Sequence, residues 1–403
     1  MTVPETDQAT STPASGATGT RRRLAHIDAM RPVKQAGVVS THALLMFAPA
    51  GTAIAVGAAL MLLHVTREAF LFVSACMLTY SCRGFRIANW RDFYRRRLTL
   101  VALPYVAWTI IYWLFTWRHV GGGWTAHTEH LGSLFVSGYY QLYYLVVLLQ
   151  FYALFPLGLA LVRRVSRQGV LVAVSLAVQM AYVSLMHWRV LPSGMTGYWA
   201  SREILSYQFY LITGMVVAMH LDDVHAWLCS HVKAIIAFTV VNAGIAEAWF
   251  FLATYKLSWL GSNSDPFQPV VIPFNIGMIA LIYVFGVWLA DPARTRATRV
   301  AVTSGSDNSY TVFLAQMIFL TMFTWIGWNK LSDVLPWPFV CAAGVVLVFA
   351  LCVGLSEVVV RTPLARPITG RSRLPFRRMR LADVHPRGES DSEGALSRSS
   401  ATA

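Results

Sequence analysis

Long apolar segments alternate with short polar ones along nearly the whole chain. About 20 apolar residues are needed to span a hydrocarbon core as a helix, and the apolar segments approach or exceed this length. We place them at about residues 35–63, 67–82, 98–117, 139–162, 169–188, 203–221, 233–253, 269–289, 307–328 and 337–360. The pattern predicts an all-α, polytopic integral membrane protein with about ten transmembrane helices.

The composition of the 403 residues agrees with this pattern, since 56% are hydrophobic and only 13% are charged. Such values exclude an ordinary soluble protein. The net charge of +14 could reflect nucleic acid or an anionic membrane surface, and the apolar segments favour the membrane, so we expect no nucleic-acid partner. Residues 1–20 contain no apolar core, so we expect no cleavable signal peptide.

The distribution of positive charge predicts which side of the membrane each segment faces. With the N-terminus in the cytoplasm, the cytoplasmic segments carry 27 Lys and Arg residues and the external loops carry 6. Cytoplasmic loops are normally the enriched ones. We therefore predict a multi-pass protein of the cell membrane with both termini in the cytoplasm. Residues 24–360 form the predicted transmembrane domain, between largely disordered tails at 1–23 and 361–403.

Arg31 and His42 are the first candidates for chemistry. Their spacing makes roughly three helical turns, so both side chains lie on one face, about 16 Å apart along the axis. His42 then lies near mid-membrane, where an ionisable group is a functional candidate and a neutral imidazole can act as general base. Arg31, near the cytoplasmic surface, can bind a phosphate. The alternatives are a His42 bonded to a neighbour such as Ser40, and Asp28 as a helix N-cap.

Three consecutive arginines, Arg95, Arg96 and Arg97, form a second candidate at the cytoplasmic end of the third segment. Each could simply set the topology or contact anionic lipid. Together they could also bind an anionic cofactor, because guanidinium groups suit phosphates.

Several polar residues within the segments or at their external ends are candidates for binding a substrate. They are Glu68, Gln141, Tyr143, Tyr144 and Gln316. Glu68 and Arg67 are expected at an external mouth, where an exposed pair could instead only anchor the helix. The tyrosines could be part of an interfacial aromatic belt or a wall on which sugar rings stack. His127 and His130 are a weak metal-binding pattern, and we expect no metal site.

The ordered set of motifs resembles the membrane-bound acyltransferase family 3 of bacteria, which includes O-acyltransferases of surface polysaccharides. The resemblance covers residues 24–330, which is most of the chain. The matching features are the Arg31 and His42 spacing, residues 70–79, residues 93–105 with their arginines, the Tyr- and Gln-rich segment ending at Pro156, and Asn308-Ser309-Tyr310.

The resemblance implies transfer of an acyl group, with acetyl the favoured one, from cytoplasmic acyl-CoA to a hydroxyl of an extracytoplasmic glycan or lipid-linked sugar. It implies catalysis by His42 with Arg31, a coenzyme site near Arg97 and no permanently bound cofactor. Three positions depart from the family pattern. Ala75 replaces a glycine, Leu100 an arginine, and Gln316 a residue that is often histidine.

A non-enzymatic exporter or flippase of a polysaccharide or lipid is the alternative function. No pair of Gly- or Pro-broken segments in matching halves supports a transporter built from inverted repeats. Consumption of acyl-CoA by the purified protein would discriminate the two functions.

Overall fold

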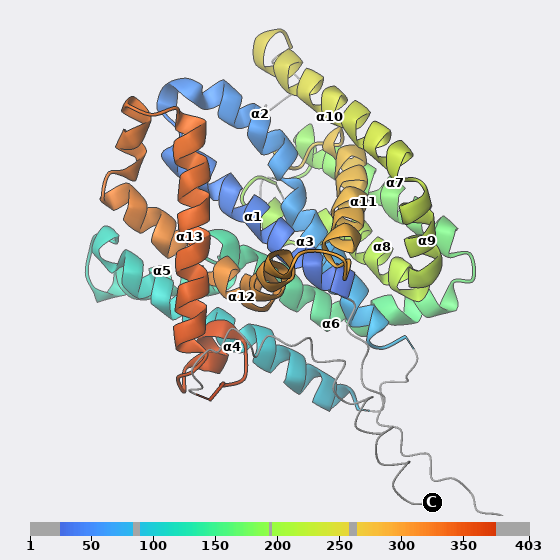
Figure 1. The fold of residues 1–403 in the computed structure, drawn as a ribbon, viewed down its shortest axis with the longest axis horizontal. Coiled ribbons are helices and arrows are strands. Elements are labelled where there is room, and N and C mark those ends of the chain that lie inside the picture. The colour runs from blue at the N-terminus through green and yellow to red at the C-terminus, as the bar shows by residue number, and fades with distance from the viewer. Residues whose placement is uncertain (1–24, 84–88, 193–195, 258–263, 376–403) are drawn as a thin grey trace, which may run out of the picture.

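The computed structural model describes residues 25–83, 89–192, 196–257 and 264–375, and all regular elements within them are helical (Figure 1). The prediction of an all-α polytopic membrane protein is confirmed. The predicted tail at 1–23 and residues 376–403 of the predicted tail at 361–403 lie outside the described residues. The longer elements are α1 (Ala25–Phe47), α2 (Ala53–Leu63), α3 (Val65–Tyr80), α4 (Trp90–Thr116), α5 (Trp124–Ser137), α6 (Tyr143–Arg164), α7 (Gln168–His187), α8 (Gln208–Met219), α9 (Leu221–Ser230), α10 (Val232–Tyr255), α11 (Val271–Leu289), α12 (Arg296–Trp325), α13 (Trp337–Val359) and the short α14 (Ala365–Thr369).

Seven stretches of the described chain are long and apolar enough to cross a membrane. They are Ala50–Tyr80, Trp90–His119, Tyr140–Arg164, Gln168–His187, Val232–Tyr255, Val271–Leu289 and Trp337–Val359. An eighth results if α8 and α9, which meet at an angle of 100°, form one span. The expected number of ten is not confirmed. The other two long helices, α1 and α12, fail the test because polar residues interrupt their apolar sequence.

The boundary between the first two predicted spans is wrong. α1 ends at Phe47, Pro49 has extended backbone angles, and one continuous stretch then runs from Ala50 to Tyr80. Proline lacks an N–H group and readily begins a helix, so the apolar run 35–63 breaks at this point. Arg67 therefore lies inside a span rather than in an external loop, and the external loops keep five of the six expected cations.

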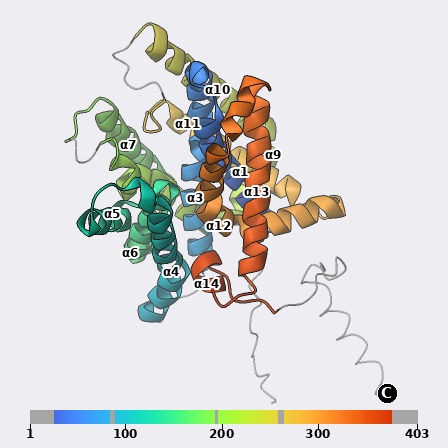
Figure 2. The ribbon, with the colours of Figure 1, turned by 90° about the vertical axis from the view of Figure 1, so that its left-hand side faces the viewer.

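Helix α1 lies at the centre of the bundle, packed against α3, α11, α12 and α13 (Figures 1 and 2). It runs parallel to α12, because Pro32 meets Gly305 at one end of the contact and the Phe47 and Phe323 rings lie 6.4 Å apart at the other. The two helices thus share a register in which position 42 of α1 is level with about position 316 of α12.

Helices α1 and α3 run antiparallel and approach closely. A Cβ added at Gly37 would lie 2.5 Å from Thr66 Cγ2, so only glycine permits this approach. Further down the same contact, the Lys34 ammonium lies over the Phe70 ring, 4.2 Å from its centroid. The polar face of α1 is therefore fixed between α12 on one side and α3 on the other.

Described structure continues beyond residue 360, where we placed the end of the transmembrane domain. The indole of Trp108 in α4 donates a hydrogen bond of 2.9 Å to the Ile368 carbonyl of α14. Gly370 has a φ of +65° and lies against the Tyr310 ring of α12. This segment covers one end of the contact between α4 and α12.

Candidate active site

The His42 imidazole is half-buried on α1 and faces the ring of Tyr140, with the two centroids 6.4 Å apart and the planes at 80°. No hydrogen bond to the imidazole forms within the part of the chain that the structure describes. The alternative in which Ser40 or a carbonyl forms a hydrogen bond with the imidazole is therefore not found among the described residues. An imidazole whose nitrogens are unoccupied is free to accept a proton from a substrate.

Arg31 lies three turns before His42 on the same face, as the spacing predicts. Its guanidinium is 3.4 Å from the Asp28 carboxylate and its side chain is 38% exposed. The alternative role of Asp28 as an N-cap is wrong, because α1 already includes Ala25 and Asp28 lies within its first turn. The carboxylate instead holds Arg31 at the end of α1.

Gln316 lies on the face of α12 that meets α1. It is separated from Gly305 by 11 residues and from Phe323 by 7, which are close to whole numbers of turns, and both of those residues contact α1. Its side chain is fully buried, and neither amide atom has a hydrogen-bond partner in the described chain. The structure thus places an unsatisfied amide level with His42.

His64 is absent from the candidates drawn from sequence, yet it lies at the junction of α2 and α3, close to this site. It is near enough to His42 and Arg67 to interact with both electrostatically. The only signal in the sequence is an ionisable residue inside an apolar run, which we placed at the end of a span. The imidazole of His64 therefore lies close to that of His42.

The expected exposed pair of Arg67 and Glu68 is buried instead. Glu68 is only 3% exposed and its Oε1 accepts a hydrogen bond of 3.0 Å from Arg67 Nη2. The pair was misplaced because the span boundary was misplaced. In a buried position the two charges need each other, so they form a fixed internal ion pair rather than an anchor at the surface.

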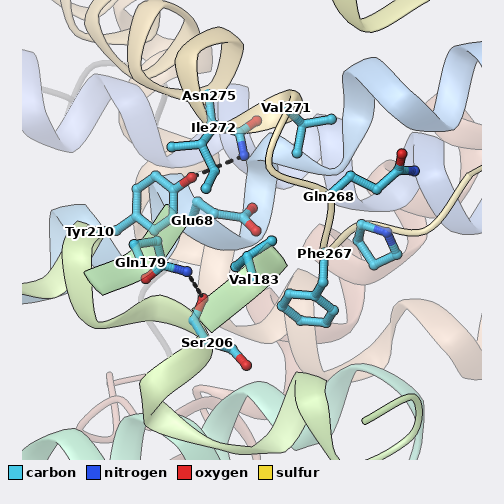
Figure 3. A pocket seen from close by; sticks show the side chains of 11 residues that line it. Glu68, Gln179, Val183, Ser206, Tyr210, Phe267, Gln268, Val271, Ile272 and Asn275 are labelled. Atoms are coloured by element: carbon cyan, nitrogen blue, oxygen red, sulfur yellow. Dashed lines mark hydrogen bonds between the residues drawn. The ribbon is translucent and has the colours of Figure 1, made fainter. Parts of the chain in front are cut away.

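Glu68 also lines a small polar cavity between α3, α7, α8 and α11 (Figure 3). The cavity measures about 10 Å³, which is room for about one water molecule. Glu68 Oε2 and Asn275 Oδ1 are buried without a partner in the described chain, and Asn275 Nδ2 donates to the Tyr210 hydroxyl. This cavity cannot hold a sugar ring, so any contact of Glu68 with a large substrate needs the cavity to open.

The substrate candidates of the fourth segment lie in three different settings. Gln141 is buried and its Nε2 donates to the Tyr112 hydroxyl (2.9 Å) and the Leu314 carbonyl (3.1 Å). The Tyr144 hydroxyl lies 3.1 Å from Ser74 Oγ. Tyr143 is half-buried and interacts with Arg67. Tyr140, which we did not single out, is the member of this group that faces His42.

The three consecutive arginines lie in the first turns of α4. Arg95 and Arg96 are exposed, and Arg95 pairs with Asp92 at 3.7 Å. Arg97 is half-buried and interacts with the Phe93 ring and with the hydroxyl of Tyr152. None of their interactions in the described chain is with Arg31 or His42, so the structure does not bring these two candidate groups into contact.

His127 and His130, which form the weak metal-binding pattern, contact neighbouring side chains of the protein. The His127 ring stacks on Trp117 with centroids 3.7 Å apart, and His130 Nε2 lies 3.3 Å from the Thr116 hydroxyl. Among the described residues there is no group of three or more His, Cys, Asp or Glu side chains arranged to hold a metal ion.

Comparison with known proteins gives one match. A family model described as an acyltransferase domain matches residues 24–357, which includes α1 and nearly all of α13. Searches of curated proteins and of solved structures found no match.

Proposed function

The chain belongs to the acyltransferase 3 family and is therefore a membrane acyltransferase; from this premise we propose that it moves an acyl group, acetyl in the simplest case, from cytoplasmic acyl-CoA to a hydroxyl of an extracytoplasmic glycan or lipid-linked sugar. Acyl-CoA acts as a donor substrate and not as a permanently bound cofactor. The proposal includes the orientation predicted from the charges, with both termini in the cytoplasm.

The observation that carries this proposal is the His42 imidazole at the centre of the bundle, with no hydrogen bond from any described residue. In the proposed reaction, His42 removes the proton of the acceptor hydroxyl as its oxygen attacks the thioester carbonyl. The tetrahedral intermediate then collapses, the C–S bond breaks, and the leaving thiolate takes the proton back from the imidazolium. General base catalysis of this kind contributes roughly a hundredfold to ten-thousandfold in rate.

The remaining candidates have different support for their proposed roles. Arg31, half-exposed at the end of α1, would orient the donor. Gln316 has unused hydrogen-bonding groups level with His42, which supports a contact with substrate there. Tyr143 and Tyr144 are proposed as part of the acceptor wall, together with Gln141 and Glu68, although all four side chains already have protein partners.

The proposed donor site at Arg95, Arg96 and Arg97 rests on their positive charge and on the exposure of Arg95 and Arg96. Leu100, where the family pattern has an arginine, is an exposed residue on α4 and supplies no further cation. Exposed guanidinium groups remain available for the phosphates of coenzyme A. A donor bound there would have to reach His42 with its thioester end.

The proposal is tested by acylation of surface glycans in a deletion strain that carries variants of the gene. Mass spectrometry should detect the acyl group with the wild-type protein and not with His42→Ala or Arg31→Ala. Leu45→Ala is the matched control, because Leu45 is an exposed residue on the same helix. Membrane levels of each variant should be equal. Full acylation by His42→Ala would contradict the mechanism.

The exporter or flippase alternative is not proposed again, because family membership identifies a transferase. The two functions are still distinguishable by experiment. A transferase consumes acyl-CoA in detergent solution, where no transport is possible.

A further inference from the structure

Lys34 is a buried cation that the mechanism above does not use. It lies on α1, one turn after Arg31 and about two turns before His42, and is 1% exposed. Its ammonium contacts the Phe70 ring, and no carboxylate lies within 4 Å of it in the described chain. Arg31, which has the same sign, acts on it electrostatically.

An ammonium group in this position requires a counter-charge. Removing it from water is costly, and attraction to an aromatic face recovers only a small part of that cost. Intramembrane cations are normally paired or line a substrate path. The described residues supply no anion, so an anionic ligand is the simplest partner.

Gln35, the next residue, supplies a second and independent observation. It is fully buried, and neither Nε2 nor Oε1 has a hydrogen-bond partner in the described chain. Gln35 also lies on the face that Arg31 and His42 share, because it follows Arg31 by four residues. A guanidinium, an ammonium and an amide thus follow one another within two turns, and all three offer N–H donors.

We propose that Arg31, Lys34 and Gln35 bind a phosphate or diphosphate group of a substrate. N–H donors on neighbouring turns, with the positive charge of Arg31 and that of Lys34 when an anion is bound, match the oxygens of a phosphate. Lys34 is about 12 Å from His42 along the helix axis, so the bound substrate has its reacting end and its phosphate at separate levels of α1. The phosphate belongs either to coenzyme A or to a lipid-linked sugar, and the inference rests on the proposed function.

The test measures ligand binding by the full-length protein in detergent. The probes are coenzyme A, pantetheine, which lacks the phosphates, and a short-chain polyprenyl phosphate. Lys34→Met should weaken binding of at least one phosphate-containing probe by roughly 10- to 100-fold, as expected for loss of a charged hydrogen bond. It should leave binding of pantetheine unchanged. Loss for coenzyme A assigns the phosphate to the donor, and loss for the polyprenyl phosphate assigns it to the acceptor.

Two further variants separate charge from structure. Lys34→Arg keeps the positive charge and should restore part of the affinity, whereas Lys330→Met removes an exposed lysine and should change nothing. Without ligand, Lys34→Met should melt no lower than the wild type, because it replaces a buried amine that has no carboxylate partner in the described chain with an apolar side chain.

The proposal is overturned if Lys34→Met binds both phosphate probes as tightly as the wild type. It is also overturned if Lys34→Met and Lys34→Arg both lower the melting temperature without ligand, since Lys34 would then have a structural role. Failure of the proposed function looks different, because the wild-type protein would then leave acyl-CoA unconsumed whatever residue occupies position 34.

Discussion

Two buried glutamines, Gln35 on α1 and Gln316 on α12, have side-chain amides without any partner in the described chain. Gln35 and Gln316 each leave both amide atoms unpaired among the described residues, and Gln316 is level with His42. Leaving such groups unsatisfied costs stability, and fully buried polar groups normally have partners. We therefore attribute these side chains to substrate binding, whereas Gln141, whose Nε2 makes two hydrogen bonds, is held by the protein itself.

This contrast predicts the effect of Gln141→Leu. The substitution removes the hydrogen bonds to Tyr112 and Leu314 and should lower the free energy of unfolding by about 1–3 kcal/mol. Thermal unfolding in detergent measures this change. Gln316→Leu, by comparison, should leave the stability unchanged or raise it, and should reduce the rate of acyl transfer. Stabilities in the opposite order would contradict the distinction between the two glutamines.

The face shared by Arg31 and His42 could be predicted from their spacing because helical periodicity alone determines it. Lys34, Gln35 and His64 could not be recognised in the same way. Their importance depends on burial and on missing partners, which are properties of the packed helices. The same reason explains the misplacement of Glu68, which is buried against α7, α8 and α11 rather than exposed.

At the scale of helices, the site depends on close contacts that leave no room for a side chain. The contact of α3 with α8 is an example, because a Cβ added at Gly214 would lie 2.4 Å from the Phe72 carbonyl oxygen. Most helix positions could be placed from the long apolar segments, but the break at Pro49 and the register between α1 and α12 could not. They depend on one proline and on contacts between distant segments.

Gly214→Ala should separate α3 from α8 and lower the free energy of unfolding by about 1–3 kcal/mol, as overpacking does. Gly244→Ala is the matched control, since a Cβ there meets nothing within 4 Å. It should change stability by less than about 1 kcal/mol. Thermal unfolding of both purified variants measures the difference, and equal effects would show that the contact with Phe72 is unimportant.

For the whole molecule, the helices allow the predicted topology without confirming it. Ten crossings require α1, α12 and the bent pair of α8 and α9 to cross in addition to the seven apolar stretches. The excess of cations at 83–97 and 361–373 over the external loops is the basis on which we predict that both termini lie in the cytoplasm. This orientation brings Arg31 and Lys34 toward the donor side.

Cysteine labelling tests the orientation directly. Cys229 on α9 is exposed, whereas the other four cysteines are buried. Its predicted side is the cytoplasm, so a membrane-impermeant maleimide should label it only after the cells are permeabilised. Lys330→Cys, on the predicted external side, should be labelled in intact cells. The reverse pattern at both positions would invert the topology.

The central claim is that His42 is the base for acyl transfer, and release of the free thiol from acyl-CoA by purified protein tests it most directly. With a hydroxyl acceptor present, the wild-type protein should release coenzyme A, and His42→Ala should reduce the rate at least about a hundredfold while its melting temperature stays close to that of the wild type. Release by His42→Ala at the wild-type rate would contradict the claim.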